Sequence, residues 1–243
     1  MLYYTSCRND QIIIEKLQEL ADKYPTRGFD NYYGKIRLEG LKWNRKAVLR
    51  VYRYLNLKMR RKRRRRIPKR IKEALVVPHT LNQTWSVDFM SDSLVNGRRF
   101  RILNFIDDCN REALINEAYY SIPAEKLVER LKDLIRERGL PKTIRTDNGP
   151  EFISKSFRTF CEQNKITLKF IQPGKPAQNA YIERFNRTFR EDVLDAYLFE
   201  DLLEVNALAF NWQINYNQNH PHKALKGMSP WIYKNQIMKI INN

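Results

Sequence analysis

Two different hydrophobic periodicities divide the chain near the end of its first third. Up to residue 57, apolar side chains recur every three or four positions, which is the spacing of helices with one buried face. Breaks at Pro25 and Gly40 separate these helices, and Asn44 is placed to cap the last one. The pattern predicts three short helices, at residues 11–23, 29–38 and from 45 onward.

The third predicted helix carries four basic side chains, Arg45, Lys46, Arg50 and Arg53. A helix, a glycine-containing turn and a basic helix are together typical of a helix-turn-helix DNA-binding domain. Three short helices packed around aliphatic side chains are also a common structural bundle, so the pattern alone leaves both interpretations open.

From Thr84 the pattern changes to short alternating segments that are rich in β-forming residues. The later segments alternate with helical patterns, which predicts an α/β domain with a mixed sheet covered by helices. A long helix is expected from about Ala177 to beyond Glu191. The other expected elements are strands at 85–90, 99–106, 113–120, 143–146 and 167–171, and helices at 124–138 and 154–164.

Charge changes this picture because it is unevenly spread. The net charge is +18, yet residues 1–84 carry 22 Lys and Arg against 7 Asp and Glu, while the remainder carries 23 against 20. The densest run is KMRRKRRRR at residues 58–66. Such a run predicts an exposed linker that binds phosphates with a strong salt dependence, although a merely solvated charge run has the same composition. Nucleic acid is therefore the favoured partner.

Several protein classes are excluded by composition. A hydrophobic content of 42% allows a real core and argues against disorder. The three cysteines have no C-x-x-C spacing, so neither a zinc finger nor a disulfide framework is predicted. Neither a signal peptide nor a run of transmembrane length is seen. We therefore expect a cytoplasmic protein.

Three acidic residues are candidates for chemistry because of the elements that carry them. Asp88 lies in the first predicted strand, Asp147 ends the fourth, and Glu183 lies in the long helix. If the first and fourth strands are neighbours, the three carboxylates could converge at one edge of the sheet. Clustered carboxylates resist joint ionisation unless a cation compensates, and their hard oxygens select Mg²⁺ or Mn²⁺. Two such ions, about 3.5–4 Å apart, would suit phosphodiester chemistry.

Each of these acids also has an ordinary interpretation. An aspartate at a strand end can simply start a turn, as Asp147 could before Asn148 and Gly149. A lone helical glutamate such as Glu183 is usually solvated. Polar residues at helical spacing share its face, whereas an apolar face suits packing on the sheet. The polar set is Asn179, Glu183, Asn186 or Arg187, and Arg190; the apolar set is Ile182, Phe185, Phe189 and Val193.

At these residues the sequence resembles the retroviral-integrase-like DDE transposases of bacterial insertion sequences, specifically the IS-three family. Asp147 and Glu183 have 35 residues between them, which matches the spacing of that superfamily. The N-terminal segment from Tyr32 is similar to the family's helix-turn-helix-like segment. The motifs that carry the resemblance are WSVDFM, IRTDNGPEF, PGKPAQNAYIERFNRTFREDVL and YNQNHPHKALKGMSP.

The resemblance implies an RNase H-like core, with a mixed five-stranded sheet and flanking helices, preceded by a small all-α helix-turn-helix-like domain. The implied domains are 1–57, a basic linker at 58–80, and a catalytic core with C-terminal helices at 81–243. Asp88, Asp147 and Glu183 would be the catalytic residues and the ligands of two Mg²⁺ or Mn²⁺ ions. Water would cleave at the element ends, and the freed 3′-hydroxyl would attack another phosphodiester.

The resemblance also implies partners. These are double-stranded DNA at element ends and target, a homo-oligomer assembled on it, and the product of an upstream reading frame, fused or cooperating. We expect DNA contacts from Arg190, which matches a basic residue seven positions after the family's glutamate, and from Arg187, Arg184, Asn179, Arg50, Arg53, Arg60, Arg61, Lys62, Arg63, Arg64, Arg65 and Arg66. The His/Cys zinc module of retroviral integrases has no counterpart in this sequence. A nucleoid-associated location would follow.

Two other functions remain open on sequence grounds. A non-catalytic DNA-binding protein, such as a regulator or a decayed transposase, would keep the basic arm but tolerate loss of a carboxylate. A structure-selective nuclease on the same fold would cut without joining and would not need the N-terminal domain. All three acids are present, which argues against decay.

Overall fold

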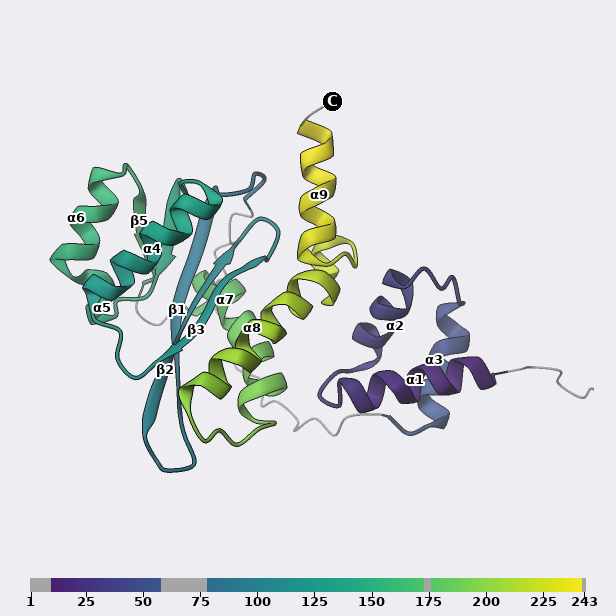
Figure 1. The fold of residues 1–243 in the computed structure, drawn as a ribbon. Coiled ribbons are helices and arrows are strands. Elements are labelled where there is room, and N and C mark those ends of the chain that lie inside the picture. The colour runs from purple at the N-terminus through teal and green to yellow at the C-terminus, as the bar shows by residue number, and fades with distance from the viewer. Residues whose placement is uncertain (1–9, 58–77, 173–175, 242–243) are drawn as a thin grey trace, which may run out of the picture. The chain divides into compact units, whose positions relative to one another are not determined.

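The computed structural model describes residues 10–57, 78–172 and 176–241. Its residues group into two compact units (Figure 1). The first comprises Met1–Pro68 with Asn219–Met228, and the second comprises Lys69–Gln218 with Ser229–Asn243. The predicted boundaries placed all of 81–243 in one domain, so the grouping of Asn219–Met228 differs from that expectation. Most of the predicted linker at 58–80 lies outside the described residues.

The N-terminal unit contains three helices at the positions that periodicity predicted. Their apolar faces meet in one core that includes Leu17, Ile36 and Val48. Asn44 caps the third helix, since its side chain accepts a hydrogen bond of 2.8 Å from the backbone N–H of Lys46. The helices are α1 (Gln11–Lys23), α2 (Phe29–Leu38) and α3 (Arg45–Tyr54).

The second unit is built on a five-stranded sheet with the order β3-β2-β1-β4-β5. The pairs β1–β2 and β2–β3 are antiparallel, whereas β4 runs parallel to β1 and β5 runs parallel to β4. This mixed sheet is the predicted RNase H-like arrangement, which is confirmed. The strands are β1 (Thr84–Ser93), β2 (Arg99–Asp107), β3 (Ala113–Tyr119), β4 (Thr143–Thr146) and β5 (Thr167–Phe170).

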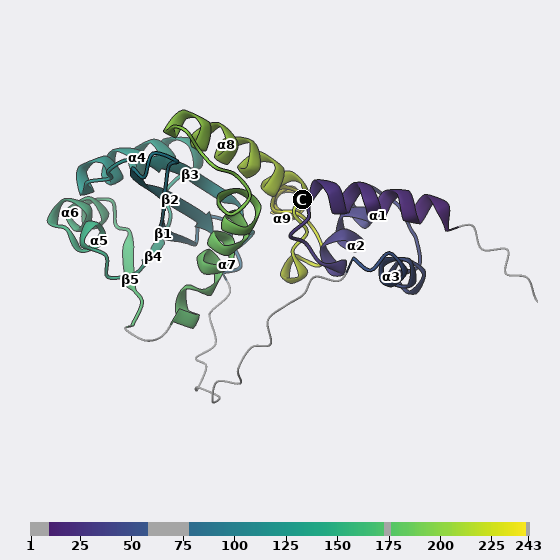
Figure 2. The same cartoon turned by 90° about the horizontal axis from the view of Figure 1, so that it is seen from below.

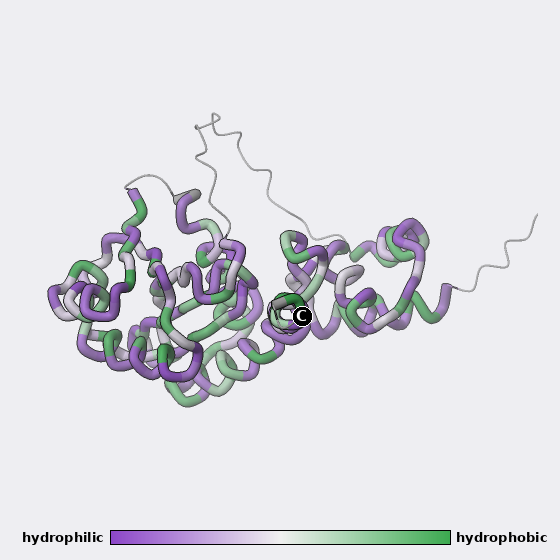
Figure 3. Tube along the Cα trace, turned by 90° about the horizontal axis from the view of Figure 1, so that it is seen from above, coloured by the Kyte–Doolittle hydropathy of each residue, from purple (hydrophilic) through white to green (hydrophobic). Residues whose placement is uncertain are grey.

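Helices cover both faces of this sheet (Figure 2). One face packs against α4 (Ala124–Arg138), α5 (Pro150–Ile153) and α6 (Lys155–Gln163), around a core that includes Trp85 and Phe105. The other face packs against α7 (Ala180–Phe189) and α8 (Leu202–Asn219). Hydrophobic and hydrophilic residues alternate along the helices, as expected for elements with one buried side (Figure 3). A last helix, α9 (Pro230–Ile241), follows.

The long helix expected from Ala177 is present with a changed backbone at both ends. A 3₁₀ turn covers Pro176–Asn179, the α-helical part is α7, and a π-helical segment covers Arg190–Leu194. Val193 and Leu194, both in the π turn, are buried in the core on the α7 side of the sheet. The short helix α5, which begins three residues after Asp147, was not predicted.

A buried glutamate holds α4 and α9 to the sheet. Glu112 follows β2, and its side chain is only 3% exposed. One carboxylate oxygen accepts from Arg138 at the end of α4 at 2.8 Å and from Trp231 in α9 at 3.0 Å, and the other accepts from Lys234 at 3.1 Å. Burial alone would raise the pKa of Glu112, but Arg138 and Lys234 hold it below its ordinary value of 4.5.

Replacing Glu112 by Gln should lower the free energy of unfolding at pH 7 by about 2–3 kcal/mol, because two buried or half-buried cations lose their counter-charge. A depressed carboxylate pKa contributes stability above the ordinary pKa and loses it as the pH falls through the folded value. The difference between wild type and Glu112→Gln should therefore shrink below about pH 4.5. Denaturant unfolding at several pH values measures this, with exposed Glu125→Gln as control. Equal stabilities at pH 7 would contradict the assignment.

Candidate active site

The parallel pairing of β1 with β4 sets two predicted carboxylates level with each other. Trp85 pairs with Ile144, and Ser86 pairs with Arg145. Continuing this register by two residues places Asp147, the residue directly after β4, opposite Asp88. The prediction that the first and fourth strands are neighbours is therefore confirmed.

Strand alternation decides which face Asp88 occupies. Val87 and Phe89 pack on the side of α4, α5 and α6, whereas Met90 packs on the side of α7 and α8. Asp88 therefore faces the side that α7 covers. Glu183 lies on α7, and this helix packs against β1 and β2.

The charges of Asp147 and Glu183 act on Asp88. Burial raises the pKa of Asp88 to about 6. A hydrogen bond of 2.8 Å from the backbone N–H of Phe89 opposes this rise, whereas the negative charges of Asp147 and Glu183 add to it. Burial also raises the pKa of Glu183, against the nearby charge of Arg187. Asp147 and Glu183 therefore both lie within electrostatic reach of Asp88, although the three carboxylates come from three different elements.

Asp147 does start a turn, as the ordinary interpretation proposed. Its Oδ1 accepts a hydrogen bond of 2.9 Å from the backbone N–H of Gly149. A Cβ on Gly149 would lie 3.0 Å from that oxygen and 3.2 Å from the Phe152 ring, so any larger residue would need these neighbours to shift by a few tenths of an ångström. The Asn148 side chain donates to the carbonyl of Ile171 at 3.1 Å, which ties the turn to the end of β5. The turn holds Asp147 in place and does not exclude a second role for it.

The acids do not form a closed metal cage. Among the described residues, no group of three or more His, Cys, Asp or Glu side chains is arranged so that it could hold a metal ion. Asp147 and Glu183 thus act on Asp88 through their charges, without the three carboxylates being gathered around a common point.

The structure separates the predicted DNA-contact residues of α7 and its flanks. Arg184 and Arg187 are exposed on α7. Arg190 instead donates to Asp92 at 3.1 Å and to the carbonyl of Ser91 at 2.9 Å, farther along β1 than Asp88. Asn179 is only 3% exposed, and its Oδ1 has no hydrogen-bond partner among the described residues.

The remaining predicted contacts belong to the N-terminal unit and the basic run. On α3, Arg53 is exposed, and Arg50 forms an ion pair of 2.7 Å with Asp10. The rest of the predicted set lies outside the described residues: Arg60, Arg61, Lys62, Arg63, Arg64, Arg65 and Arg66.

Sequence reasoning did not single out two asparagines beside the candidate centre. Asn104 on β2 is the strand partner of Asp88, and Asn116 on β3 is the partner of Asn104. Both are fully or almost fully buried. The available signal was an amide within otherwise apolar strand segments, but its relation to Asp88 needs the register of three strands.

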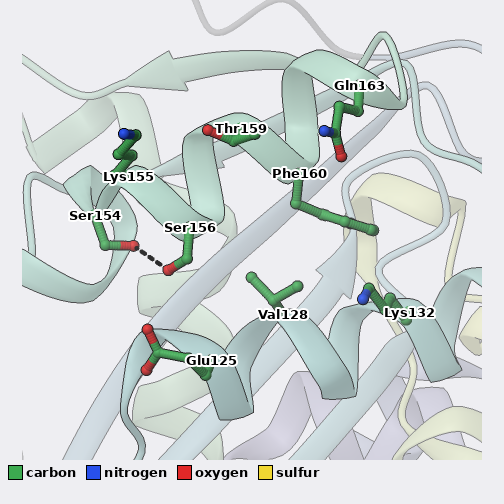
Figure 4. Close-up of a pocket in the computed structure, with 9 residues that line it drawn as sticks. All are labelled: Glu125, Val128, Lys132, Ser154, Lys155, Ser156, Thr159, Phe160 and Gln163. Carbon is green, nitrogen blue, oxygen red and sulfur yellow. Dashed lines mark hydrogen bonds between the residues drawn. The ribbon is translucent and has the colours of Figure 1, made fainter.

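A cavity of about 620 Å³ lies elsewhere, between α4 and α6 (Figure 4). It is lined by polar side chains such as Ser154 and Ser156, whose hydroxyls lie 3.3 Å apart, and by Phe160. None of the three predicted carboxylates lines it, and α4 and α6 cover the face of the sheet opposite Asp88. The chemistry of the side chains, and not the depth of a pocket, therefore marks the candidate site.

Within the described residues, no helix is both long and apolar enough to cross a lipid bilayer.

Comparisons with known proteins identify the family of this chain. Two family models, both described as integrase core domain, match residues 78–176 and 164–230. A 31.7 kDa protein of insertion element IS407 from Burkholderia multivorans is 37% identical over 91% of this chain and 80% of its own length. Transposase InsD of insertion element IS2A/D/F/H/I/K from Escherichia coli is 26% identical over 94% of this chain and 80% of its own length.

Among solved structures, the chain is similar to the HTLV-2 integrase catalytic core domain in complex with magnesium (trimeric form). The identity is 19%, the TM-score is 0.46, and the match covers 63% of this chain and 95% of that one. The family assignment rests on the sequence matches, which span both the sheet and the helix carrying Glu183. The chain therefore belongs to the insertion-sequence transposases of the DDE/integrase superfamily, which are enzymes of DNA transposition.

Proposed function

We propose that this transposase cleaves DNA at the ends of its insertion sequence and joins the freed ends by strand transfer, with Asp88, Asp147 and Glu183 as its catalytic residues. The observation that carries the proposal is the register of β1 and β4, which sets Asp147 level with Asp88 on the face of the sheet that α7, the helix of Glu183, covers. The negative charges of Asp147 and Glu183 also add to the raised pKa of Asp88. Such coupling of acids from separate elements has no evident use for folding, because like charges destabilise a compact state.

The donor set suits two divalent cations such as Mg²⁺ or Mn²⁺. All three side chains offer hard carboxylate oxygens, and a cation would relieve the repulsion that helps raise the pKa of Asp88. When bound, such ions activate an attacking oxygen and stabilise a leaving oxygen at phosphorus. With a pKa near 6, the Asp88 carboxyl is ionised at neutral pH and available as a ligand.

The chain's own residues orient the acids for this role. The backbone N–H of Phe89 donates a hydrogen bond to the Asp88 carboxylate, and the backbone N–H of Gly149 donates one to the Asp147 carboxylate. Glu183 is carried by α7, which packs on β1 and β2 of the sheet. One set of carboxylates would serve both reaction steps, since each is an in-line displacement at phosphorus.

The two steps differ only in the attacking hydroxyl. In cleavage, a water oxygen bonds to phosphorus, the bond to the 3′ oxygen breaks, and that oxygen takes up a proton. In joining, the 3′-hydroxyl loses its proton, bonds to the phosphorus of another phosphodiester and displaces that phosphodiester's leaving oxygen. Neither step needs an oxidant, a reductant or a second site.

The N-terminal unit and the basic run at 58–66 would bind the DNA. Exposed Arg53 on α3 and exposed Arg184 and Arg187 on α7 are available for phosphate contacts. Because transposition joins two ends, we propose a homo-oligomer on DNA, acting with or fused to the upstream-frame product. A cytoplasmic, nucleoid-associated location follows from the substrate.

Glu183→Gln should abolish cleavage and joining, which means that both rates fall at least about 100-fold. The affinity for element-end DNA should stay largely unchanged. The amide keeps the size of the side chain but removes a negative oxygen ligand. Cleavage of labelled element ends and a mobility-shift titration measure the two properties. Glu125→Gln on α4, across the sheet, is the matched control and should behave as wild type. If Glu183→Gln lost DNA affinity to the same extent as cleavage, the catalytic assignment of Glu183 would be wrong.

The basic run should act through phosphates. Changing the arginines among residues 60–66 to alanine should weaken binding to all DNA sequences and flatten the dependence of affinity on salt, because fewer counterions are released. Binding titrations over a range of salt concentrations, with element-end and unrelated DNA, measure both effects. If only the element-end sequence lost affinity, the run would read sequence and the phosphate-binding role would be wrong.

A further inference from the structure

A row of buried polar side chains crosses the sheet at the level of Asp88. Asp88 on β1 pairs with Asn104 on β2, and Asn104 pairs with Asn116 on β3. All three residues face the side of the sheet that α7 and α8 cover, where their strand neighbours, such as Met90 and Ile102, form an apolar core. Asn104 is 0% exposed and Asn116 is 2% exposed.

These side chains are linked by hydrogen bonds that lead to Asp88. The Asn116 amide donates to Asn104 Oδ1 at 2.9 Å, and the Asn104 amide donates to Asn186 Oδ1 at 2.8 Å. Asn186, on α7 one turn after Glu183, then donates to Asp88 Oδ2 at 2.8 Å. Each amide therefore donates its hydrogen bond in the same direction along the row, toward the Asp88 carboxylate.

The direction of the row follows from the chemistry of its end. An ionised carboxylate only accepts hydrogen bonds, so Asn186 must present its Nδ2 to Asp88. Its Oδ1 then requires a donor, which Asn104 supplies, and the Oδ1 of Asn104 requires a donor in turn, which Asn116 supplies. The requirement ends at Asn116, whose Oδ1 is buried without a partner among the described residues.

That unpaired oxygen argues against a purely structural row. An apolar side chain at position 116 would avoid burying an acceptor that bonds to nothing, and would suit the surrounding core better. Three amides aligned in one direction polarise one another and strengthen the last bond, the one made to Asp88. The free-energy cost of burying the unpaired Asn116 oxygen is therefore offset by a stronger hydrogen bond from Asn186 to Asp88.

We infer that Asn186, Asn104 and Asn116 are positioning residues that fix the carboxylate of Asp88 for metal ligation. This inference rests on the proposed function, in which Asp88 is a ligand. The backbone N–H of Phe89 binds Oδ1 and Asn186 binds Oδ2, so the carboxylate plane cannot rotate freely. Each oxygen keeps a lone pair for a cation.

Direct Mn²⁺ binding, followed by the loss of the free-Mn²⁺ electron paramagnetic resonance signal, tests the inference on the full chain. Asn104→Leu should raise the apparent Kd for Mn²⁺ on the order of 10-fold, as expected when a partner of a ligating carboxylate is lost. Asn116→Leu should raise it by a smaller factor, although this residue touches neither Asp88 nor the cation. The Mn²⁺ concentration for half-maximal cleavage should rise in parallel, with the rate at saturating Mn²⁺ retained.

Asn217→Leu is the matched control. Asn217 is as buried as Asn116, and its amide bonds the backbone of Ala113 through both its oxygen, at 2.8 Å, and its nitrogen, at 2.9 Å. This replacement should lower the melting temperature and leave the Kd for Mn²⁺ unchanged. Should Asn104→Leu fail to fold, Asn116→Leu and Asn186→Leu carry the same comparison.

Asp88→Ala distinguishes a failure of the proposed function from a failure of the inference about the three asparagines. If Asp88→Ala weakens Mn²⁺ binding but the folded row variants bind as wild type, the row only supports the fold and the inference is overturned, while the proposed function stands. An equal shift with Asn217→Leu would overturn it as well. If Asp88→Ala itself binds Mn²⁺ and cleaves as wild type, the proposed function fails and the inference falls with it.

Discussion

The parallel pairing of β1 with β4 is the constraint on which the site depends. It sets Asp147 level with Asp88, and it brings together residues that are far apart in the sequence. Because side chains alternate along a strand, a slip of one residue in β1 would move Asp88 to the face covered by α4 and α6. It would also bury Val87 and Phe89 on the wrong side, so the hydrophobic pattern that builds the core also fixes where the acid points.

Local patterns in the sequence were sufficient to locate most elements. The helices at 11–23, 29–38 and 124–138 have the predicted bounds, because their apolar spacing and their Gly or Pro breaks are local signals. The π turn after Phe189 was not predictable in this way, since the apolar spacing there does not distinguish it from a continuing α-helix. The short helix α5 was not predicted, because the Asn-Gly pair that precedes it indicated only a turn.

The candidate site was predictable only in its charged members. Acids at a strand, a strand end and a helix could be proposed from placement, but Asn104 and Asn116 carry no sign of their role until the register of β1, β2 and β3 is known. The same holds for Arg190, whose spacing from Glu183 suggested a phosphate contact, whereas its guanidinium binds Asp92 and Ser91. Helical spacing specifies a face, not the partner found there.

A strand-transfer assay on labelled terminal-repeat DNA is the decisive measurement, with Mg²⁺ or Mn²⁺ against EDTA and with wild type against Asp147→Asn. Joined products are expected only when the metal is present and Asp147 is intact. The wild type is assayed both alone and fused to the upstream-frame product, so that a requirement for that partner is not mistaken for a lack of activity. Joined products from Asp147→Asn, or in EDTA, would show that these carboxylates and their metal do not carry out the reaction.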